Sequence, residues 1–314
     1  MTKIKINSEF AHELVLAVPY AYWLHKQGRL EKVITSKGMS PFYYFCKNVE
    51  ERFNIRTIDN SSAGLNDLPN SWIHHNSLAV TGKPYGELIG EEQDKINGVL
   101  DYSKWSPPSY WKHYENLNFD KKPFVVINNN YNIEYGMIES DSSRFFDIKC
   151  LYEFFSYLTE KGYVVIYKRP DNTEFAPDQN EINTLQKNLC LSANVKGLGI
   201  ISDYDLCEYY DGKVINMNKL KLEYPDYSYN EFQLRLFANS SGFITPNGGG
   251  GILCGYFKAP IIMHVPHGKE LRTNYLTNKD SYYQKLSENK LYTVLDPNNE
   301  SNYQKILKKV KEIF

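Results

Sequence analysis

Four consecutive glycines, Gly248 to Gly251, follow Asn247 between a short apolar run and a helix-like stretch. At the start of a helix the first N–H groups have no partner within the helix, and the helix dipole adds about half a positive charge there. Because glycine has no Cβ, a diphosphate could approach this backbone closely, and the Asn247 amide could add a donor. The alternative is a tight turn at which a helix crosses close to a sheet. The sequence therefore predicts a phosphate-binding turn that matches neither the dinucleotide fingerprint G-x-G-x-x-G nor the P-loop.

Two cations and a run of asparagines occupy the ends of predicted strands. Lys168 and Arg169 lie at the end of the apolar run 163–170, and Asn130 ends the run 123–130. In an open α/β sheet the carboxyl ends of the strands line the ligand crevice. We therefore expect Lys168 or Arg169 to pair with phosphate oxygens, with a solvated charge pair as the alternative. We expect Asn130 to contact a phosphate, a donor sugar or an acceptor, with an ordinary Asn-rich turn as the alternative.

Candidate proton acceptors lie just after the first predicted strand. Glu9 lies three residues before His12 and four before Glu13, so these side chains come close to one another on a helix. A histidine titrates near neutral pH and can accept a proton from a hydroxyl when a carboxylate orients it. We therefore predict His12, Glu9 or Glu13 as a general base, with a capped or surface histidine as the alternative. His264 and His267 follow a later strand, and we expect them to contact a donor sugar or an acceptor.

The elements that would position these residues alternate between strands and helices. This order predicts an α/β fold of two doubly wound, Rossmann-like domains, 1–120 and 121–314, which face each other across a cleft. Pro19 is expected to kink the first helix. The predicted strands are 3–7, 30–36, 55–59, 123–130, 163–170, 213–218, 242–246 and 260–265, and the predicted helices are 8–28, 41–53, 147–162, 178–190, 228–240, one that opens at 252, and 302–314.

Composition excludes several classes of protein. Lys and Arg number 36 against 37 Asp and Glu in 314 residues, which argues against a binder of nucleic-acid backbones. The five cysteines are scattered without CxxC spacing, which indicates neither a zinc site nor a disulfide framework and suits a reducing compartment. No signal peptide and no apolar run of about 18 residues is apparent. We therefore expect a soluble cytoplasmic protein without a transmembrane segment or a metal.

The stretch 228–265 resembles the nucleotide-sugar half of GT-B glycosyltransferases. It reads SYNEFQLRLFANSSGFITPNGGGGILCGYFKAPIIMHV: a helix, a strand, a glycine-rich turn with a helix of small residues, and an x-Pro-apolar strand that begins at Ala259-Pro260. The resemblance is looser over 123–314, and 1–120 is similar in architecture alone, as acceptor domains are. The turn lacks the Ser/Thr-Gly-Pro-x-His pattern of the heptosyltransferase branch and the Glu-x-Phe-Gly pattern of the common retaining branch. No branch is therefore assigned.

The resemblance implies a metal-independent glycosyltransferase. We expect it to invert the configuration of the sugar, with retention as the alternative, because the branch that fixes the stereochemistry is not assigned. The enzyme would move a hexose, deoxyhexose or pentose from a nucleotide-diphosphate sugar to a hydroxyl of a glycan or glycolipid acceptor, with no further cofactor. By the same resemblance, the main-chain groups of Met217 and Asn218 hold the nucleobase or ribose, the base lies near His12, and the helix 302–314 packs back on the first domain. A nucleotide-sugar epimerase on the same scaffold and a glycan-binding module without catalysis are the alternatives.

Overall fold

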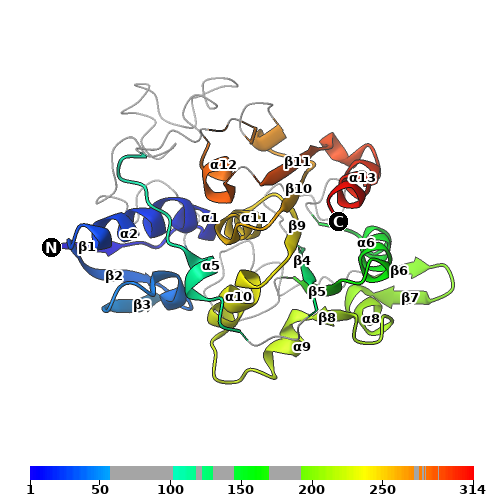
Figure 1. Cartoon of the computed structure of the whole chain (residues 1–314), viewed down its shortest axis with the longest axis horizontal. Coiled ribbons are helices and arrows are strands. Elements are labelled where there is room, and N and C mark those ends of the chain that lie inside the picture. The colour runs from blue at the N-terminus through cyan, green and yellow to red at the C-terminus, as the bar shows by residue number, and fades with distance from the viewer. Residues whose placement is uncertain are drawn as a thin grey trace.

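The computed structural model describes residues 1–56, 102–117, 122–129, 145–169, 192–271, 276, 277, 279, 281–288 and 290–314. Two parallel sheets, one of three strands in the order β1-β2-β3 and one of six in the order β11-β10-β9-β4-β5-β8, form its framework (Figure 1). A two-stranded antiparallel hairpin, β6-β7, projects from the second sheet. The predicted α/β class with parallel sheets is therefore confirmed.

The bounds of the elements follow the predicted alternation of strands and helices. The strands are β1 (Thr2–Lys5), β2 (Leu30–Ser36), β3 (Val49–Phe53), β4 (Phe124–Asn128), β5 (Val164–Lys168), β6 (Ser192–Val195), β7 (Gly199–Ser202), β8 (Val214–Asn216), β9 (Gly242–Pro246), β10 (Ile261–Val265) and β11 (Leu291–Leu295). The helices are α1 (Phe10–His12), the π-helical η1 (Glu13–Ala17), α2 (Val18–Lys26), α5 (Tyr110–His113), α6 (Ile148–Glu160), α8 (Asp203–Glu208), α9 (Met217–Lys221), α10 (Tyr229–Ala238), α11 (Gly249–Cys254), α12 (Tyr282–Ser287) and α13 (Gln304–Ile313), and the 3-10 turns are η2 (Ser40–Tyr43), η5 (Gly255–Phe257), η6 (Lys269–Leu271) and η7 (Pro297–Asn299).

The six-stranded sheet has apolar residues on both faces, because successive residues of a strand point to opposite sides. We call the side covered by α6, α8 and α13 the outer face; Ile127 and Val165 pack there. We call the side toward α9, α10, α11 and the N-terminal residues the inner face; Val126 and Ile166 pack there. Both sets of side chains are fully buried. Strands buried on both faces read as continuous apolar runs, as these do.

One hydrophobic core joins the inner face to the N-terminal sheet. Tyr110 of α5 packs its ring 4.8 Å from that of Tyr256 and 6.2 Å from that of Phe257. The Asn230 side chain of α10 donates to the carbonyl of Gly38 at 2.8 Å. Apolar residues of both sheets therefore form a single cluster. The predicted boundary between residues 120 and 121 falls in 118–121, outside the described residues.

One predicted element has the wrong type, and two others are present but differ from the prediction in their place in the fold. The predicted helix 178–190 and most of the predicted strand 55–59 lie outside the described residues. The helix predicted over 41–53 is a 3-10 turn, η2, followed by β3, which pairs with β2 in register from Val33 and Val49. The strand 260–265 is not the last one, since β11 adds to the edge of the sheet beyond it.

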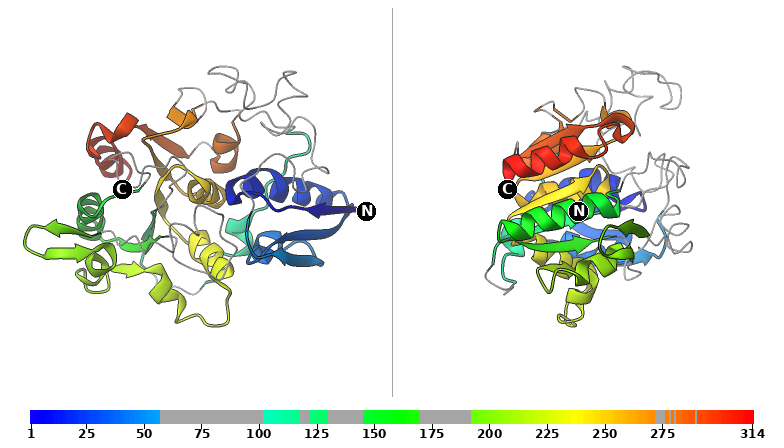
Figure 2. Two further views of the ribbon diagram at one scale, coloured as in Figure 1. Left: turned by 180° about the vertical axis from the view of Figure 1, so that it is seen from behind. Right: turned by 90° about the vertical axis from the view of Figure 1, so that its right-hand side faces the viewer.

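The third correction concerns the C-terminal helix, which, among the residues that the structure describes, packs on the outer face of the six-stranded sheet and not on the N-terminal half. Ile306, Leu307 and Val310 of α13 are buried in the outer-face cluster, beside α6 (Figure 2). The chain reverses directly after β11 through residues in the left-handed region, and the Asp296 carboxylate accepts from Ser301 N at 3.2 Å. This tight connection keeps α13 on its own sheet.

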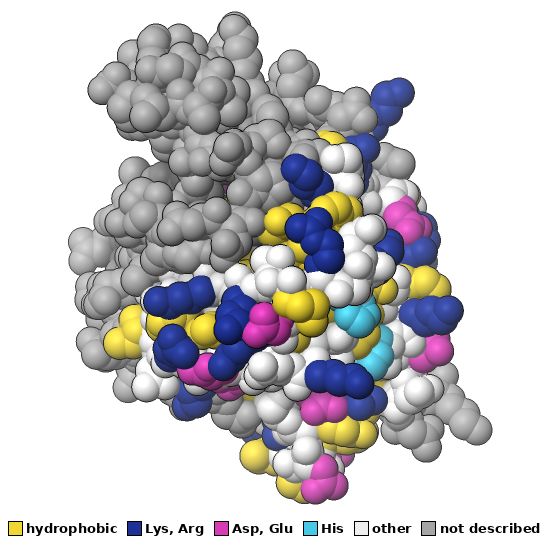
Figure 3. All heavy atoms as spheres, turned by 90° about the vertical axis from the view of Figure 1, so that its left-hand side faces the viewer, with side chains coloured by type: hydrophobic (Ala, Val, Ile, Leu, Met, Phe, Trp, Pro, Cys, Tyr) yellow, Lys and Arg dark blue, Asp and Glu magenta, His cyan; other side chains and the backbone are white. Residues whose placement is uncertain are grey.

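The side of the molecule formed by the first sheet carries charges of both signs (Figure 3). Lys3 pairs with Glu31 at 3.2 Å, and Glu50 pairs with Lys32 and Arg52, each at 2.6 Å. Positive and negative side chains therefore alternate along this surface. Among the described residues, none of the helices is both long and apolar enough to cross a bilayer.

Candidate functional site

The glycine turn joins β9 to α11, as predicted. The Asn247 N–H donates to the carbonyl of His264 at 2.9 Å, which continues the pairing of β9 with β10. Gly248 then has a φ of 137°, a conformation that residues with a Cβ rarely adopt. The first helical hydrogen bond runs from Ile252 N to Gly248 O at 3.0 Å, so the N–H groups before it start the helix. Gly248, Gly249 and Gly250 are half-buried at this start.

The space left by the missing side chains is filled by neighbouring segments. A Cβ on Gly249 would lie 3.1 Å from Phe10 Cδ1, one on Gly250 would lie 2.3 Å from Asn128 Nδ2, and one on Gly251 would lie 2.7 Å from Met263 Cε. The glycines thus let α1, β4 and β10 approach the turn closely, as the tight-turn alternative required. The expectation that all four glycines keep space open for a diphosphate is corrected: only the half-buried helix start remains for a ligand.

The Asn247 side chain is not at the edge of the turn. It is fully buried, and its amide donates to the carbonyl of His267 at 3.5 Å. Its predicted role as an additional donor to a phosphate does not fit this position. The side chain instead ties the turn to the segment after β10.

Lys168 lies at the glycine turn, because its position in β5 places it on the inner face. Its Nζ donates to Asn128 Oδ1 at 2.8 Å, and Asn128 Nδ2 donates to Thr245 Oγ1 at 3.0 Å. Asn128 is also the side chain that a Cβ on Gly250 would strike. One amide thus connects the cation, the end of β4 and the first turn of α11. Lys168 and the glycines therefore lie near each other, as predicted.

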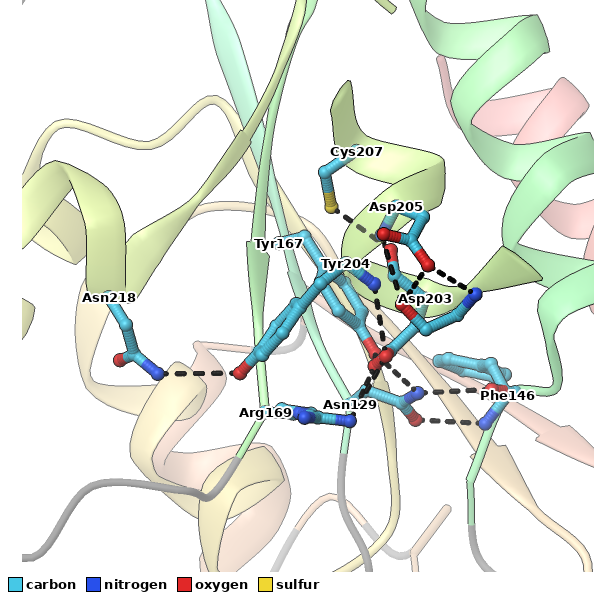
Figure 4. Close-up of polar contacts among 10 residues, drawn as sticks. Asn129, Phe146, Tyr167, Arg169, Asp203, Tyr204, Asp205, Cys207 and Asn218 are labelled. Carbon is cyan, nitrogen blue, oxygen red and sulfur yellow. Dashed lines mark hydrogen bonds and ion pairs between the residues drawn. The ribbon is translucent and has the colours of Figure 1, made fainter. Parts of the chain in front are cut away.

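Arg169 belongs to a separate network on the outer face (Figure 4). Its Nη1 lies 3.0 Å and 3.1 Å from the two carboxylate oxygens of Asp203, which is fully buried. Its guanidinium lies 3.9 Å from the ring centre of Tyr204, and Tyr167 donates to Asp203 at 2.7 Å. Arg169 is thus committed to a carboxylate and an aromatic ring on the other side of the sheet from Lys168.

Met217 and Asn218 open α9 at the carboxyl end of β8. Met217 is fully buried, and the Asn218 side chain donates to the Tyr204 hydroxyl at 3.4 Å. The Asn216 side chain caps the helix by accepting from Asn218 N at 2.8 Å. The main-chain groups predicted to hold a nucleobase therefore lie at the same sheet edge as Lys168, one strand away.

The expectation that the chain has no Asp-x-Asp sequence, a pattern that metal-dependent glycosyltransferases use, is wrong, because Asp203, Tyr204 and Asp205 have this spacing. Asp203 is paired with Arg169, and Asp205 accepts from Ser202 N at 2.9 Å in the capping box of α8. The two carboxylates thus have different partners. Within the described residues, no three His, Cys, Asp or Glu side chains gather as metal ligands would.

Glu9 and His12 form a pair on the segment whose residues Phe10 and Ala11 contact the glycine turn. Glu9 Oε2 lies 3.3 Å from His12 Nδ1, and their side chains are 22% and 13% exposed. Their helix, α1, reaches the turn through Phe10, whose ring packs on Gly249, and the Ala11 backbone nitrogen lies 3.4 Å from the position of a Gly249 Cβ. The separation of Glu9 and His12 is an ion-pair distance, and Nδ1 makes no hydrogen bond to the carboxylate. A carboxylate this close to an imidazole can stabilise its protonated form, as it would beside a general base.

Glu13 is not available to a substrate. It is fully buried, and its carboxylate accepts from the Tyr43 hydroxyl at 2.8 Å, from Arg56 Nη1 at 2.6 Å and from the Thr35 hydroxyl. The predicted role of Glu13 as a base is therefore corrected, because its oxygens are occupied inside the N-terminal half.

His264 points away from the glycine turn. It lies on the outer face, 2% exposed, with its ring centre 5.9 Å from that of Phe146 and 5.6 Å from that of Tyr303. Burial lowers the pKa of His264 to about 4, although Asp296 at 3.6 Å acts in the opposite direction. This histidine cannot contact a sugar, which corrects its predicted role.

Of the two remaining candidates, the structure describes His267, whereas Asn130 lies outside the described residues. His267 is half-buried after β10, and its carbonyl accepts from Asn247. Asn128, the first residue of the asparagine run that includes Asn130, ends β4 on the inner face. Thr245, which sequence reasoning missed, lies one residue before the end of β9 on the same face, and its signal was a polar residue that closes an apolar run next to the glycines.

Solved structures to which the chain is similar are named as glycosyltransferases, whereas no family model and no curated protein matches the sequence. ADP-heptose lipopolysaccharide heptosyltransferase II of E. coli is 10% identical over 100% of this chain and 98% of that chain, with a TM-score of 0.48. An E. coli heptosyltransferase solved with ADP is 9% identical over 99% and 97%, also with a TM-score of 0.48. A family 9 glycosyltransferase of Veillonella parvula is 9% identical over 99% and 89%, with a TM-score of 0.43.

Proposed function

We propose that this chain is a glycosyltransferase of GT-B type that uses a nucleotide-diphosphate sugar as donor. The proposal rests on one observation: Gly249 packs on Phe10 and Ala11 of the segment that carries the Glu9–His12 pair, and Lys168 approaches the same turn through Asn128. A candidate anion site and an acid–base pair thus lie on segments that contact each other. The sequence resemblance over 228–265 indicates a reaction that would use both: transfer of a sugar from a nucleotide-diphosphate donor to a hydroxyl.

The donor diphosphate would bind at the start of α11. The N–H groups of Gly248 to Gly250 and the ammonium group of Lys168 would neutralise the charge that develops on the leaving diphosphate. The nucleobase or ribose would lie toward the main chain of Met217 and Asn218. In this arrangement the diphosphate needs no metal ion, because fixed protein charges and dipoles balance it.

The acceptor hydroxyl would approach from the side of α1. His12, with the Glu9 carboxylate 3.3 Å from its Nδ1, would take the hydroxyl proton as the oxygen attacks the anomeric carbon. Attack from the face opposite the diphosphate inverts the configuration at that carbon. Glu9 stabilises the imidazolium that forms, and it does not itself need to touch the substrate.

Donor binding is tested by thermal unfolding with UDP, GDP, ADP and dTDP sugars in the presence of EDTA. One nucleotide is expected to raise the melting temperature, because a ligand at 100 times its Kd stabilises the folded state by about 2.7 kcal/mol. Stabilisation by none of the four would contradict the proposal. Binding of glycans without any donor would indicate a binding module instead.

A pair of glycine variants then locates the site. In Gly249→Ala the new methyl group lies 3.1 Å from Phe10. The control is Gly255→Ala, in which the methyl group lies 3.1 Å from Leu286; Gly255 is on the same helical run but away from the turn. We expect Gly249→Ala to weaken donor binding about tenfold, a loss of about 1.4 kcal/mol, while Gly255→Ala binds like the wild type. Equal affinities in the two variants would place the donor elsewhere.

A further inference from the structure

Pro19 explains the π-helical segment that follows His12. A proline has no N–H, so it cannot donate to the carbonyl four or five residues before it. In η1 the Val18 N–H binds Glu13 O, five residues back, and the next donor in this pattern would be Pro19. The carbonyls of Leu14 and Val15 therefore lose a donor from Pro19. Single π-turns inside helices are frequent at functional sites.

Two side chains from distant parts of the sequence supply these donors. The Trp105 indole N–H donates to Val15 O at 2.7 Å, and Ser106 N donates to Pro19 O at 3.2 Å. The Tyr256 hydroxyl donates to Leu14 O and is itself buried. Trp105 is thus a structural residue rather than a surface platform for a sugar ring.

Tyr256 links the two halves of the candidate site. It lies in η5, which continues directly from α11, the helix that starts at the glycine turn. The same helical run therefore touches the first helix at both ends: Gly249 packs on Phe10, and Tyr256 binds the carbonyl of Leu14. In the sequence, His12 lies between these two contacts. The segment that carries the candidate base is thus fixed to the helical run at two points.

Glu13 fixes the other side of the segment. Its carboxylate is held by Tyr43, Arg56 and Thr35, all in the N-terminal half, so α1 cannot rotate freely about its axis. Burial raises the pKa of both Tyr43 and Tyr256, which keeps their hydroxyl protons in place at neutral pH. The Tyr256 hydroxyl adds a contact from the C-terminal half, so residues of both halves hold this segment.

We propose that Tyr256 is a positioning residue, which holds the Glu9–His12 pair at its working distance from the glycine turn through the carbonyl of Leu14. This inference rests on the proposed function. It adds a residue that need not touch either substrate and that acts through the π-helical backbone.

The test compares Tyr256→Phe with Tyr110→Phe. The Tyr110 hydroxyl is equally buried, but it donates to the carbonyl of Phe42 at 2.7 Å and not to the carbonyl of Leu14. With the best donor found by thermal unfolding, we expect Tyr256→Phe to lower kcat about tenfold while the KM for the donor stays unchanged. Tyr110→Phe should keep the wild-type kcat. If loss of a buried hydroxyl acts only through a general effect on folding, kcat will fall in both variants alike. This result would overturn the proposal.

A second measurement does not depend on catalysis. The NMR signal of the His12 imidazole, assigned by its disappearance in His12→Gln, reports the pKa and surroundings of this ring. Tyr256→Phe is expected to shift its titration, and Tyr110→Phe is not. If the wild type transfers no sugar, the proposed function fails, while this shift still shows that Tyr256 positions α1. An unchanged titration in Tyr256→Phe would overturn the positioning role.

Discussion

The inner and outer faces of the six-stranded sheet both carry polar residues at the carboxyl edge, but the partners of these residues differ between the two faces. On the outer face, Arg169 is paired with buried Asp203, and His264 lies between aromatic rings and Asp296. On the inner face, Lys168 binds an amide that lies against the glycine turn. We infer that outer-face polar groups maintain the fold and that inner-face polar groups serve a ligand.

Removal of Arg169 should have the largest effect. Arg169→Ala leaves the fully buried Asp203 carboxylate without its cation, and the loss of one partner of a buried pair costs about 3 kcal/mol or more. Urea unfolding followed by circular dichroism measures this change. Adding Asp203→Asn to the same variant should recover part of the loss. A change below about 1 kcal/mol would show that the outer-face network is not structural.

His264 should make stability depend on pH. Its pKa in the folded state, about 4, lies below the value near 6.5 of an unfolded chain, so the unfolded state binds more protons in this window. The stabilisation is complete above pH 6.5 and is lost as the pH falls toward 4, with a loss of about 2 kcal/mol between pH 7 and pH 5. His264→Gln should remove this part of the pH dependence in urea titrations at the two pH values. An equal slope in both proteins would assign the dependence to other groups.

Lys168 should show the smallest effect, and on a different property. Lys168→Met keeps the apolar stem and removes the charge, so donor affinity should fall about tenfold, while the unfolding free energy changes little. Calorimetric titration with the donor, together with urea unfolding, separates the two quantities. Arg169→Met should show the reverse: donor binding unchanged and stability reduced. Similar losses of affinity in both variants would remove the distinction between the two faces.

Much of the fold could be predicted from local patterns. The bounds of β2 and β9 agree with the runs 30–36 and 242–246, because apolar residues bounded by turn residues mark buried strands clearly. The segment 41–53 was misread because its aromatic residues lie close together, as they would on a helix, whereas the structure buries Phe42 and Tyr43 through a single 3-10 turn. Such a choice depends on tertiary packing and not on local pattern.

The site could be predicted only in part, and the reason is the parity of residues along the strands. Lys168 and Arg169 are adjacent, and both follow a run that is apolar on both faces, so the sequence does not show which of them points inward. The same ambiguity affected His264. For Glu13, the sequence showed the helical spacing from Glu9, but the partners that bury it come from residues 35, 43 and 56. Contacts of that range cannot be read from spacing.

The aromatic seam between the sheets has a consequence for how the molecule moves. Tyr110, Tyr256 and Phe257 are buried where the residues of both sheets meet, so a hinge opening that parted them would expose their rings to water. The two sheets should therefore melt together in one calorimetric transition. Any opening that admits a substrate would then arise from local rearrangement of loops and not from rigid-body separation of two lobes.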